Sequence, residues 1–368
     1  MKTWLNIEIK IFQGTEMKNL KYCKFNKIEL SDVFFDSLKA DYSGFKAWFK
    51  KKELADEQAY VFYNSKNKID GFLYLKSETD VDDKIDPPLP IVSTLKVGTL
   101  KINAHGTKLG ERFIKKIFDH AINGEFEQIY VTVFSKHKSL IDLFERYGFE
   151  TYATKVTPDG EEQVLVRQMQ SLTGNVVREF PLFNFEDRKY YLLAIYPEYH
   201  SAFLPDSILN NENHDIVQDV SHTNSIHKVF ISGIARTKVM KPGDLVLIYR
   251  TNDGKGKAYY RSVASSIGVV EEVKQIKSFG SESEFIKYTK PYSIFTIAQL
   301  KEYFTNKKKS YIIKFTYNAA LKKRIIRKRL MEECMISTRT RWDFMSLTEA
   351  QIKWVAAAGE INEGLIVN

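Results

Sequence analysis

The chain has few of the residues that indicate a disulfide scaffold, a metal site or a membrane span. Only two cysteines occur in 368 residues, Cys23 and Cys334, and their separation fits no metal-binding motif. The seven histidines are scattered along the chain. No run of about 18 apolar residues is present, and MKTWLNIEIKIF at the start lacks the apolar segment and cleavage site of a signal peptide. These absences predict a cytoplasmic protein with no membrane span and no metal.

Apolar residues are abundant enough for two packed cores. They make up 43% of the chain, with 13% aromatic residues, and 368 residues exceed the usual size of one domain. Small polar residues interrupt the hydrophobic periodicity at Ser171–Asn175. We therefore expect two domains, residues 1–172 and 173–368.

A glycine-bounded turn is the most informative local feature. The segment Leu95–Gly110 reads LKVGTLKINAHGTKLG, which predicts a strand, a turn and the start of a helix with Phe113 and Ile117 on its apolar face. The polar residues Lys115, Lys116 and Asp119 are expected on the opposite face. The first N–H groups of a helix lack intrahelical partners and carry partial positive charge, so the turn predicts an anion site. It is neither a P-loop nor a dinucleotide motif, and the alternative is a turn that only links strand to helix.

The elements around this turn follow a recognisable order. Strand-like and helical segments precede it, Leu20–Ile28 and Asp32–Phe49 among them, and a strand at Gln128–Phe134 and a helix at Leu140–Arg146 follow it. Tyr147-Gly148-Phe149 and a further strand end the series. Over residues 18–170 this order resembles the GNAT-type N-acetyltransferases. The resemblance implies an α/β (α+β) acetyltransferase fold with a mixed central sheet, and acetyl-CoA as cofactor.

The same resemblance assigns residues to acetyl-CoA. In the family a glycine turn holds the coenzyme A pyrophosphate, and a strand edge, here Thr99–Ile102, binds the pantetheine arm through its backbone. Lys108 would add positive charge if it points inward, and would otherwise be a solvated lysine. The implied cofactor-binding residues are Leu100, Ile102, His105, Gly106, Thr107, Lys108, Leu109, Gly110, Phe134 and Ser135.

The acid and base for acetyl transfer are harder to assign. Phe144 stands where the family often has a tyrosine that acts as general acid. Tyr147 lies about one helical turn away and is our candidate catalytic residue; the alternative is a packing role ahead of Gly148. No carboxylate occurs in Ile91–Ile102, although the acidic loop before it could attract a cationic amine.

The second half has a different character, with several short strands separated by turns. The phrases KPGDLVLIY (Lys241–Tyr249) and SIGVVEEV (Ser266–Val273) resemble the PUA-like superfamily, which includes the ASCH and EVE domains. The resemblance covers residues 188–320 and implies a mainly antiparallel β-barrel with helices, and recognition of RNA or modified bases. The GxKxxE signature of many ASCH domains is absent, and Gly233–Lys238 stands in its place.

Charge distribution agrees with a nucleic-acid partner for the second half. Residues 1–172 hold 26 basic and 25 acidic residues, whereas the remainder holds 29 and 21, so almost all of the net charge of +9 is in the second half. A strand is expected at Tyr311–Tyr317, and the alternative for the basic residues of Ala319–Leu330 is a solvated helix face. The predicted RNA-binding residues are Lys307, Lys308, Lys309, Lys322, Lys323, Arg324, Arg327, Lys328 and Arg329.

Three functions fit the sequence. The first is an acetyl-CoA-dependent N-acetyltransferase whose second domain binds RNA and delivers an RNA-linked amine. The second is the same enzyme acting on a protein or a small amine, with the second domain as a scaffold. The third is a non-catalytic module that binds coenzyme A and nucleic acid, which Phe144 favours.

Overall fold

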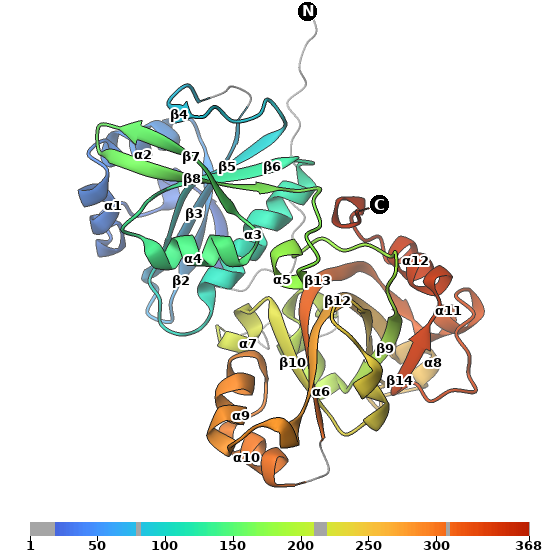
Figure 1. Ribbon diagram of the computed structural model, residues 1–368. Helices are drawn as coiled ribbons and strands as arrows, with labels where there is room; N and C mark the ends of the chain where they lie inside the picture. Colours follow the sequence, from blue (N-terminus) through green and yellow to red (C-terminus); the bar gives the residue numbers. More distant parts are fainter. Residues whose placement is uncertain (1–18, 79–81, 210–218, 307–309, 368) are drawn as a thin grey trace, which may run out of the picture.

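Two mixed β-sheets organise the chain in the computed structural model, which describes residues 19–78, 82–209, 219–306 and 310–367. Helices lie between the sheets and on their outer faces (Figure 1). The sheets follow one another along the chain, with β8 of the first ending at Gln168 and the next helix beginning at Val176. The predicted division at residue 172 falls in this connection and stays a prediction.

The first sheet has the strand order β1-β2-β3-β5-β6-β8-β7-β4, and only β5 and β6 pair in parallel. A phenylalanine-rich cluster packs helices α1 (Asp36–Asp41) and α2 (Phe45–Leu54) against one face. Helices α3 (Leu109–Asn123) and α4 (Lys138–Arg146) cover the other face. The mixed sheet agrees with the expected fold class. The strands are β1 (Leu20–Lys24), β2 (Gln58–Tyr63), β3 (Ile69–Glu78), β4 (Ile85–Asp86), β5 (Thr94–Ile102), β6 (Gln128–Phe134), β7 (Glu150–Thr157) and β8 (Gly160–Gln168).

The second sheet is open, so the prediction of a β-barrel was wrong. Its order is β10-β13-β12-β11-β9-β14, and the edge strands β10 and β14 do not pair with each other in the described residues. Strand β9 pairs in parallel with β11, whereas the other pairs are antiparallel. The β10 edge meets the 3₁₀ turn Lys290–Tyr292 instead of another strand. The strands are β9 (Tyr190–Ile195), β10 (His227–Ser232), β11 (Leu245–Arg250), β12 (Val263–Gln275), β13 (Tyr311–Ile326) and β14 (Phe344–Leu347).

The helix considered for Ala319–Leu330 is mostly a strand. Residues as far as Ile326 continue β13 because they pair with β12, Ile325 opposite Ala264 for example. Only Arg327–Glu332 is helical, as α11. The other helices of this half are α5 (Val176–Glu179), α6 (Pro197–Phe203), α7 (Ser221–Asn224), α8 (Ala258–Arg261), α9 (Glu282–Thr289), α10 (Ile297–Thr305) and α12 (Glu349–Ala358).

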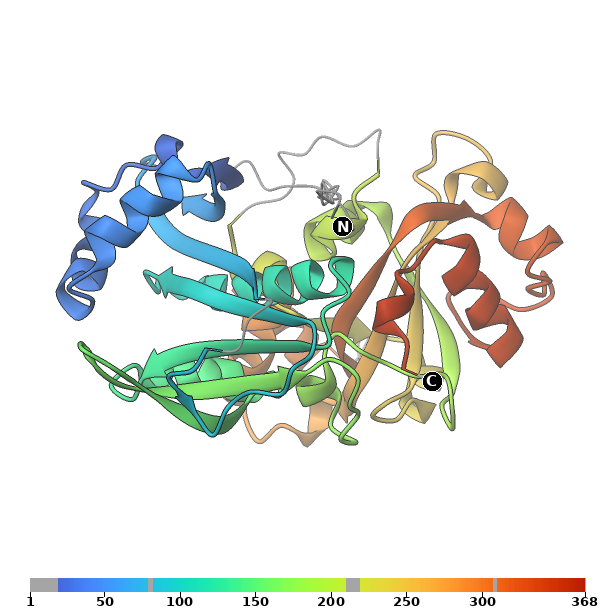
Figure 2. The same cartoon turned by 90° about the horizontal axis from the view of Figure 1, so that it is seen from above.

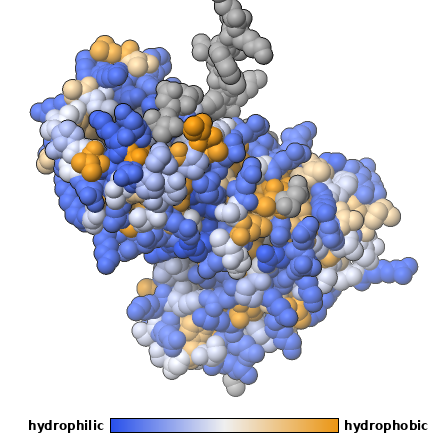
Figure 3. Space-filling view, turned by 45° about the horizontal axis from the view of Figure 1, so that its top comes forward, coloured by the Kyte–Doolittle hydropathy of each residue, from blue (hydrophilic) through white to orange (hydrophobic). Residues whose placement is uncertain are grey.

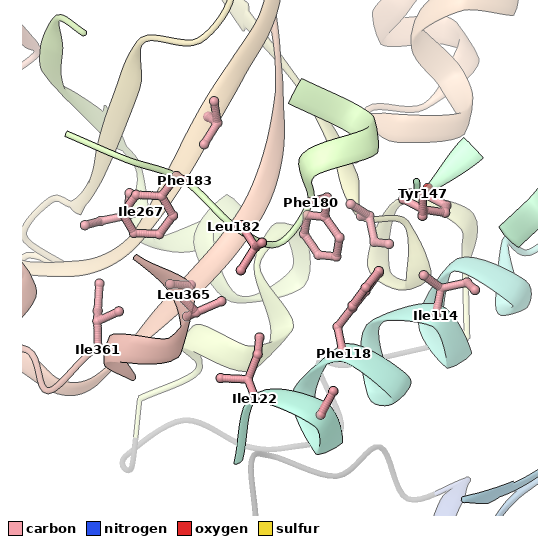
Figure 4. Close-up of a cluster of buried hydrophobic side chains, with 14 of the residues drawn as sticks. Ile114, Phe118, Ile122, Tyr147, Phe180, Leu182, Phe183, Ile267, Ile361 and Leu365 are labelled. Carbon is pink, nitrogen blue, oxygen red and sulfur yellow. The ribbon is translucent and has the colours of Figure 1, made fainter. Parts of the chain in front are cut away.

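Helix α3 lies between the two halves (Figure 2), and most of its residues are buried. Phe118 and Ile122 of α3 share one apolar core with Phe180 and Leu182 of the second half (Figure 4). Lys115, expected on the face opposite the apolar stripe, is only 15% exposed and lies 3.5 Å from an Asp206 oxygen. The polar face of α3 is therefore an interface between the halves.

The exterior is largely hydrophilic on the face shown in Figure 3, with small hydrophobic patches between polar residues. Among the described helices, none combines the length and apolarity that a membrane crossing requires. Within the same residues, no three His, Cys, Asp or Glu side chains group as metal ligands would.

Candidate functional site

The parallel strands β5 and β6 separate halfway along their length. They pair from Thr94 opposite Gln128 to Val97 opposite Val131, and no pair joins them beyond that point. On its other side β5 stays paired with β3 as far as Ile102, through a bulge. The stretch from Gly98 to Ile102 thus leaves one backbone edge open, and an open strand edge can bind an extended chain through main-chain hydrogen bonds.

The glycine turn follows directly after this open edge. Gly106 and Lys108 have left-handed backbone conformations, with φ of 80° and 61°, and α3 begins at Leu109. In the described part of the chain, no acceptor is bonded to the backbone N–H groups of residues 106–110. Several unpaired N–H groups at the start of a 15-residue helix are chemically suited to an anion, because they can donate hydrogen bonds and carry partial positive charge.

The second half holds the opposite, carbonyl side of this turn. Ser221 Oγ donates to Gly106 O at 2.8 Å, and Asn224 Nδ2 donates to Thr107 O at 2.9 Å. Both donors come from α7, more than a hundred residues along the chain. The carbonyl groups of Gly106 and Thr107 are hydrogen-bonded to α7, whereas the backbone N–H groups of the turn stay available. The second half therefore fixes the conformation of the turn.

The two ionisable side chains of the turn, Lys108 and His105, both lie close to carboxylates. Lys108 Nζ lies 3.4 Å from Glu111 Oε1 and 5.1 Å from the ring centre of Tyr292, in the second half. His105 Nε2 lies 3.8 Å from Asp70 Oδ2 and 3.9 Å from Asp219 Oδ2. An anion in the turn would therefore be held mainly by backbone groups.

The other predicted cofactor residues line the two separating strands and α3. The side chains of Leu100 and Leu109 are buried in the core, so only their backbone is available to a ligand. A Cβ atom on Gly110 would lie 2.9 Å from Leu143 of α4 and 3.7 Å from Ile102, so this glycine lets α3 approach α4 closely. Ser135, just after β6, accepts a hydrogen bond from Gln163.

A second group of polar residues gathers at the end of β6, where the link between α1 and α2 folds over the strand. The Tyr42 ring stacks on Phe134 with 5.1 Å between centroids, and its hydroxyl donates to Glu162 Oε1 at 2.9 Å. Burial and the negative charge of Glu162 raise the pKa of Tyr42. Tyr42 and Glu162 are 120 residues apart, so no sequence pattern joined them.

Tyr147, the predicted general acid, is fully buried and faces the second half. Its hydroxyl lies 3.1 Å from His227 Nε2, and His227 Nδ1 is hydrogen-bonded to Glu271, which pairs with Lys314 at 2.8 Å. Burial raises the pKa of Tyr147, and so does the charge of Glu111. The structure thus gives this hydroxyl an interface partner, and the catalytic role stays a prediction.

The predicted RNA-binding residues are scattered over different environments. Lys307, Lys308 and Lys309 lie outside the described residues. Arg324 points inward and donates to Asp206 O at 2.9 Å. Four of the remaining residues form ion pairs or lie over an aromatic ring. Lys323 pairs with Glu360, Lys328 with Glu332 and Arg329 with Glu333, Arg327 lies 4.5 Å from the Trp342 ring centre, and Lys322 is exposed.

A buried cationic group lies where the halves meet. Lys228 is fully buried, and burial lowers its pKa to about 7. Its ammonium nitrogen donates to the backbone carbonyls of His222 and Thr223. Burial alone would raise the pKa of nearby Asp206, but the charges of Arg112 and Lys115 hold it well below its usual range.

Comparisons with known proteins found similarity in structure only. No protein-family model matches the chain, and no curated protein matches it. Among solved structures, the ASCH protein of Zymomonas mobilis is 13% identical with a TM-score of 0.32, over 46% of this chain and 96% of its own. A putative acetyltransferase of Acinetobacter baylyi ADP1 is 14% identical with a TM-score of 0.31, over 42% and 93%.

A putative phosphinothricin N-acetyltransferase is 15% identical with a TM-score of 0.32, over 40% of this chain and 96% of its own. The structural neighbours thus include both acetyltransferases and ASCH proteins, each covering part of the chain. At these identities and TM-scores, none of the likenesses carries functional information.

Proposed function

We propose that the protein is an acetyl-CoA-dependent N-acetyltransferase. One observation carries this proposal: the unpaired N–H groups of residues 106–110 lie directly after the open backbone edge of β5. An anion site next to an open strand edge suits a ligand with a pyrophosphate at one end and an amide-containing arm at the other.

In this proposal the backbone of Gly106–Gly110 binds the pyrophosphate, and the edge from Gly98 to Ile102 binds the pantetheine arm. Bound acetyl-CoA supplies an acetyl group activated as a thioester. The protein positions the bound acetyl-CoA in two ways. Helix α7 fixes the turn, and the parallel pairing at Thr94–Val97 sets where β5 and β6 separate.

The test is calorimetric titration of the full chain with acetyl-CoA, using two matched glycine variants. Gly106 and Gly174 have φ of 80° and 79°, and a Cβ atom on either would meet nothing within 4 Å. Alanine at either site therefore costs a similar strain of about 1–2 kcal/mol. We expect Gly106→Ala to weaken acetyl-CoA binding about tenfold and Gly174→Ala to leave it unchanged. Equal effects of the two variants would contradict the assigned turn.

RNA binding by the second half, and an RNA-linked acceptor, remain part of the proposal. Arg327, Lys328 and Arg329 each lie over an aromatic ring, which places charge beside stacking surfaces. However, two of the three also pair with glutamates on the same helix or just after it. RNA affinity that falls steeply with salt would support this part, and salt-independent or absent binding would favour a scaffold.

If acetyl-CoA binds without turnover of any amine, the non-catalytic module is the better description. Buried Phe144, which cannot donate a proton, favours that outcome. Free thiol released from acetyl-CoA in the presence of amines measures turnover directly.

A further inference from the structure

The second sheet has an open backbone edge at β14. Among the described residues, β14 pairs with β9 on one side and with no strand on the other. Ala194 N–H donates to Asp343 O, and along an antiparallel pair the residues turn their backbone groups alternately toward the partner strand and away from it. The backbone groups of Phe344 and Ser346 therefore point away from β9. Within the described ranges, Ser346 N–H and C=O have no hydrogen-bond partner.

A pocket of about 410 Å³ lies beside this edge. One wall is β14, and the other is the 3₁₀ helix Ala235–Val239, which follows β10 along the chain. The two walls are joined by an ion pair, because Arg236 Nη2 lies 2.9 Å from Asp343 Oδ1. The pocket thus occupies the opening between the two edges of the second sheet, and its volume is in the range of ligand-binding pockets.

The pocket combines apolar walls with a basic rim. Buried Phe344 and Met345 line it, together with Val239, which leaves 47% of its surface exposed. An apolar side chain that enters the pocket would cover this exposed valine. The apolar walls alone therefore suit a ligand with at least one hydrophobic group.

The charges at the rim are unequal. Arg236 and Arg341 share the single carboxylate of Asp343, at 2.9 and 3.5 Å. Lys238 also lines the pocket and is exposed, and the part of the chain that the structure describes offers it no ion-pair partner. Three cations thus surround one carboxylate, which favours an acidic ligand.

We propose that β14 and this pocket bind an extended acidic segment of a partner protein as an added strand. The segment exchanges backbone hydrogen bonds with Ser346 and places one apolar side chain against Val239 and Phe344. Side chains two positions away lie on the same face of a strand, so acidic residues there meet Arg236 and Lys238. This interaction is independent of acetyl-CoA binding in the first half.

Two other occupants fit this surface less well. A nucleic acid binds mainly through its phosphates, whereas two of the three cations here already share a carboxylate and the walls are apolar. A second copy of the chain, paired edge to edge about a two-fold axis, would bring the same basic rim close to itself. An acidic peptide satisfies the open edge, the apolar walls and the charge together.

The test is NMR titration of the full chain with the peptide acetyl-Glu-Thr-Leu-Thr-Glu-amide, compared with acetyl-Lys-Thr-Leu-Thr-Lys-amide. We expect only the acidic peptide to bind, and hydrogen exchange of Ser346 N–H to slow when it does. Lys238→Glu should weaken binding of the acidic peptide about tenfold. Lys277→Glu is the matched control, because Lys277 is also exposed and lies in the 3₁₀ helix Ile276–Ser278; it should have no effect.

A second pair of variants tests the backbone edge. Ser346→Pro removes the outward N–H, which an edge strand tolerates, and should abolish binding, whereas Ser346→Ala keeps the N–H and should retain it. The amide spectrum away from β14 checks the fold of each variant. If Ser346→Pro does not fold, the comparison of Lys238→Glu with Lys277→Glu decides.

Four results would overturn the proposal. The first is a dissociation constant for the acidic peptide weaker than about 1 mM, or equal affinity for the two peptides. The second is unchanged exchange of Ser346 N–H at saturation. The third is displacement of the acidic peptide by decauridylate, which would assign the pocket to nucleic acid. The fourth is a peptide-free dimer that Ser346→Pro dissociates, which would assign the edge to a second copy of the chain.

Discussion

Stability should rise with pH because of Lys228, which is buried between the two halves. Its pKa is lowered by burial to about 7, from the ordinary lysine value of 10.5. The unfolded chain therefore binds more protons than the folded chain between these two values. By linkage, the free energy of unfolding increases with pH across this window and is lowest below pH 7, where the folded protein must bury the charge.

The magnitude follows from the pKa difference. With a pKa of about 7, Lys228 loses its proton in the folded protein between pH 7 and pH 9, whereas the same lysine in the unfolded chain keeps it. This window of about 2 pH units adds about 3 kcal/mol to the free energy of unfolding between pH 6 and pH 9. The neutral amine can still donate to the carbonyls of His222 and Thr223, so deprotonation does not cost these hydrogen bonds.

The assay is urea unfolding of wild type and Lys228→Met at pH 6, 7, 8 and 9. Methionine has a similar length and carries no charge, and the Phe203 and Tyr317 rings lie close to the site. Histidines also titrate in this range, and the difference between the two proteins removes the contribution of those that, unlike His222, do not sense the Lys228 charge. Wild type should gain about 3 kcal/mol relative to the variant between pH 6 and 9. A difference that does not change with pH would refute the view that a buried lysine charge sits at this interface.

Two further predictions concern contacts between the halves. Asn224→Ala removes the hydrogen bond to Thr107 O and should weaken acetyl-CoA binding about fivefold. Asn252→Ala removes a similar hydrogen bond, to Gly256 O at a different turn, and should leave the affinity for acetyl-CoA unchanged. Titration calorimetry measures the acetyl-CoA affinity of both variants. Tyr147→Phe should lower the free energy of unfolding by about 1 kcal/mol, because His227 loses its hydrogen bond. A large fall in kcat at unchanged stability would instead identify Tyr147 as the acid.

The turn and its neighbouring elements could be predicted because their signals are local. The strand before Gly106, the apolar stripe of α3 and the strand β6 all depend on residues close together in sequence. The separation of β5 from β6 could only be inferred through the family resemblance, because strand pairing is not visible in local pattern.

Features that depend on the packing of the two halves could not be predicted. The helical period placed Lys115 and Lys116 on one polar side of α3, but the period does not show what covers that side. The hydrogen bonds from α7 to Gly106 and Thr107 join residues more than 100 positions apart in the sequence. The hydrogen bond between Tyr42 and Glu162 does the same. The open second sheet was missed because short strands and turns are equally compatible with a barrel and with a sheet whose edges are covered.

The binding of acetyl-CoA at the glycine turn is tested most directly by NMR of the full chain labelled with 15N-glycine. The sequence contains 18 glycines, and among them Gly106 and Gly110 carry N–H groups assigned to the pyrophosphate. Saturating acetyl-CoA should shift these two signals strongly downfield, while Gly174 and Gly280 stay in place. A titration in which Gly106 and Gly110 do not move, although acetyl-CoA is bound, would contradict the account.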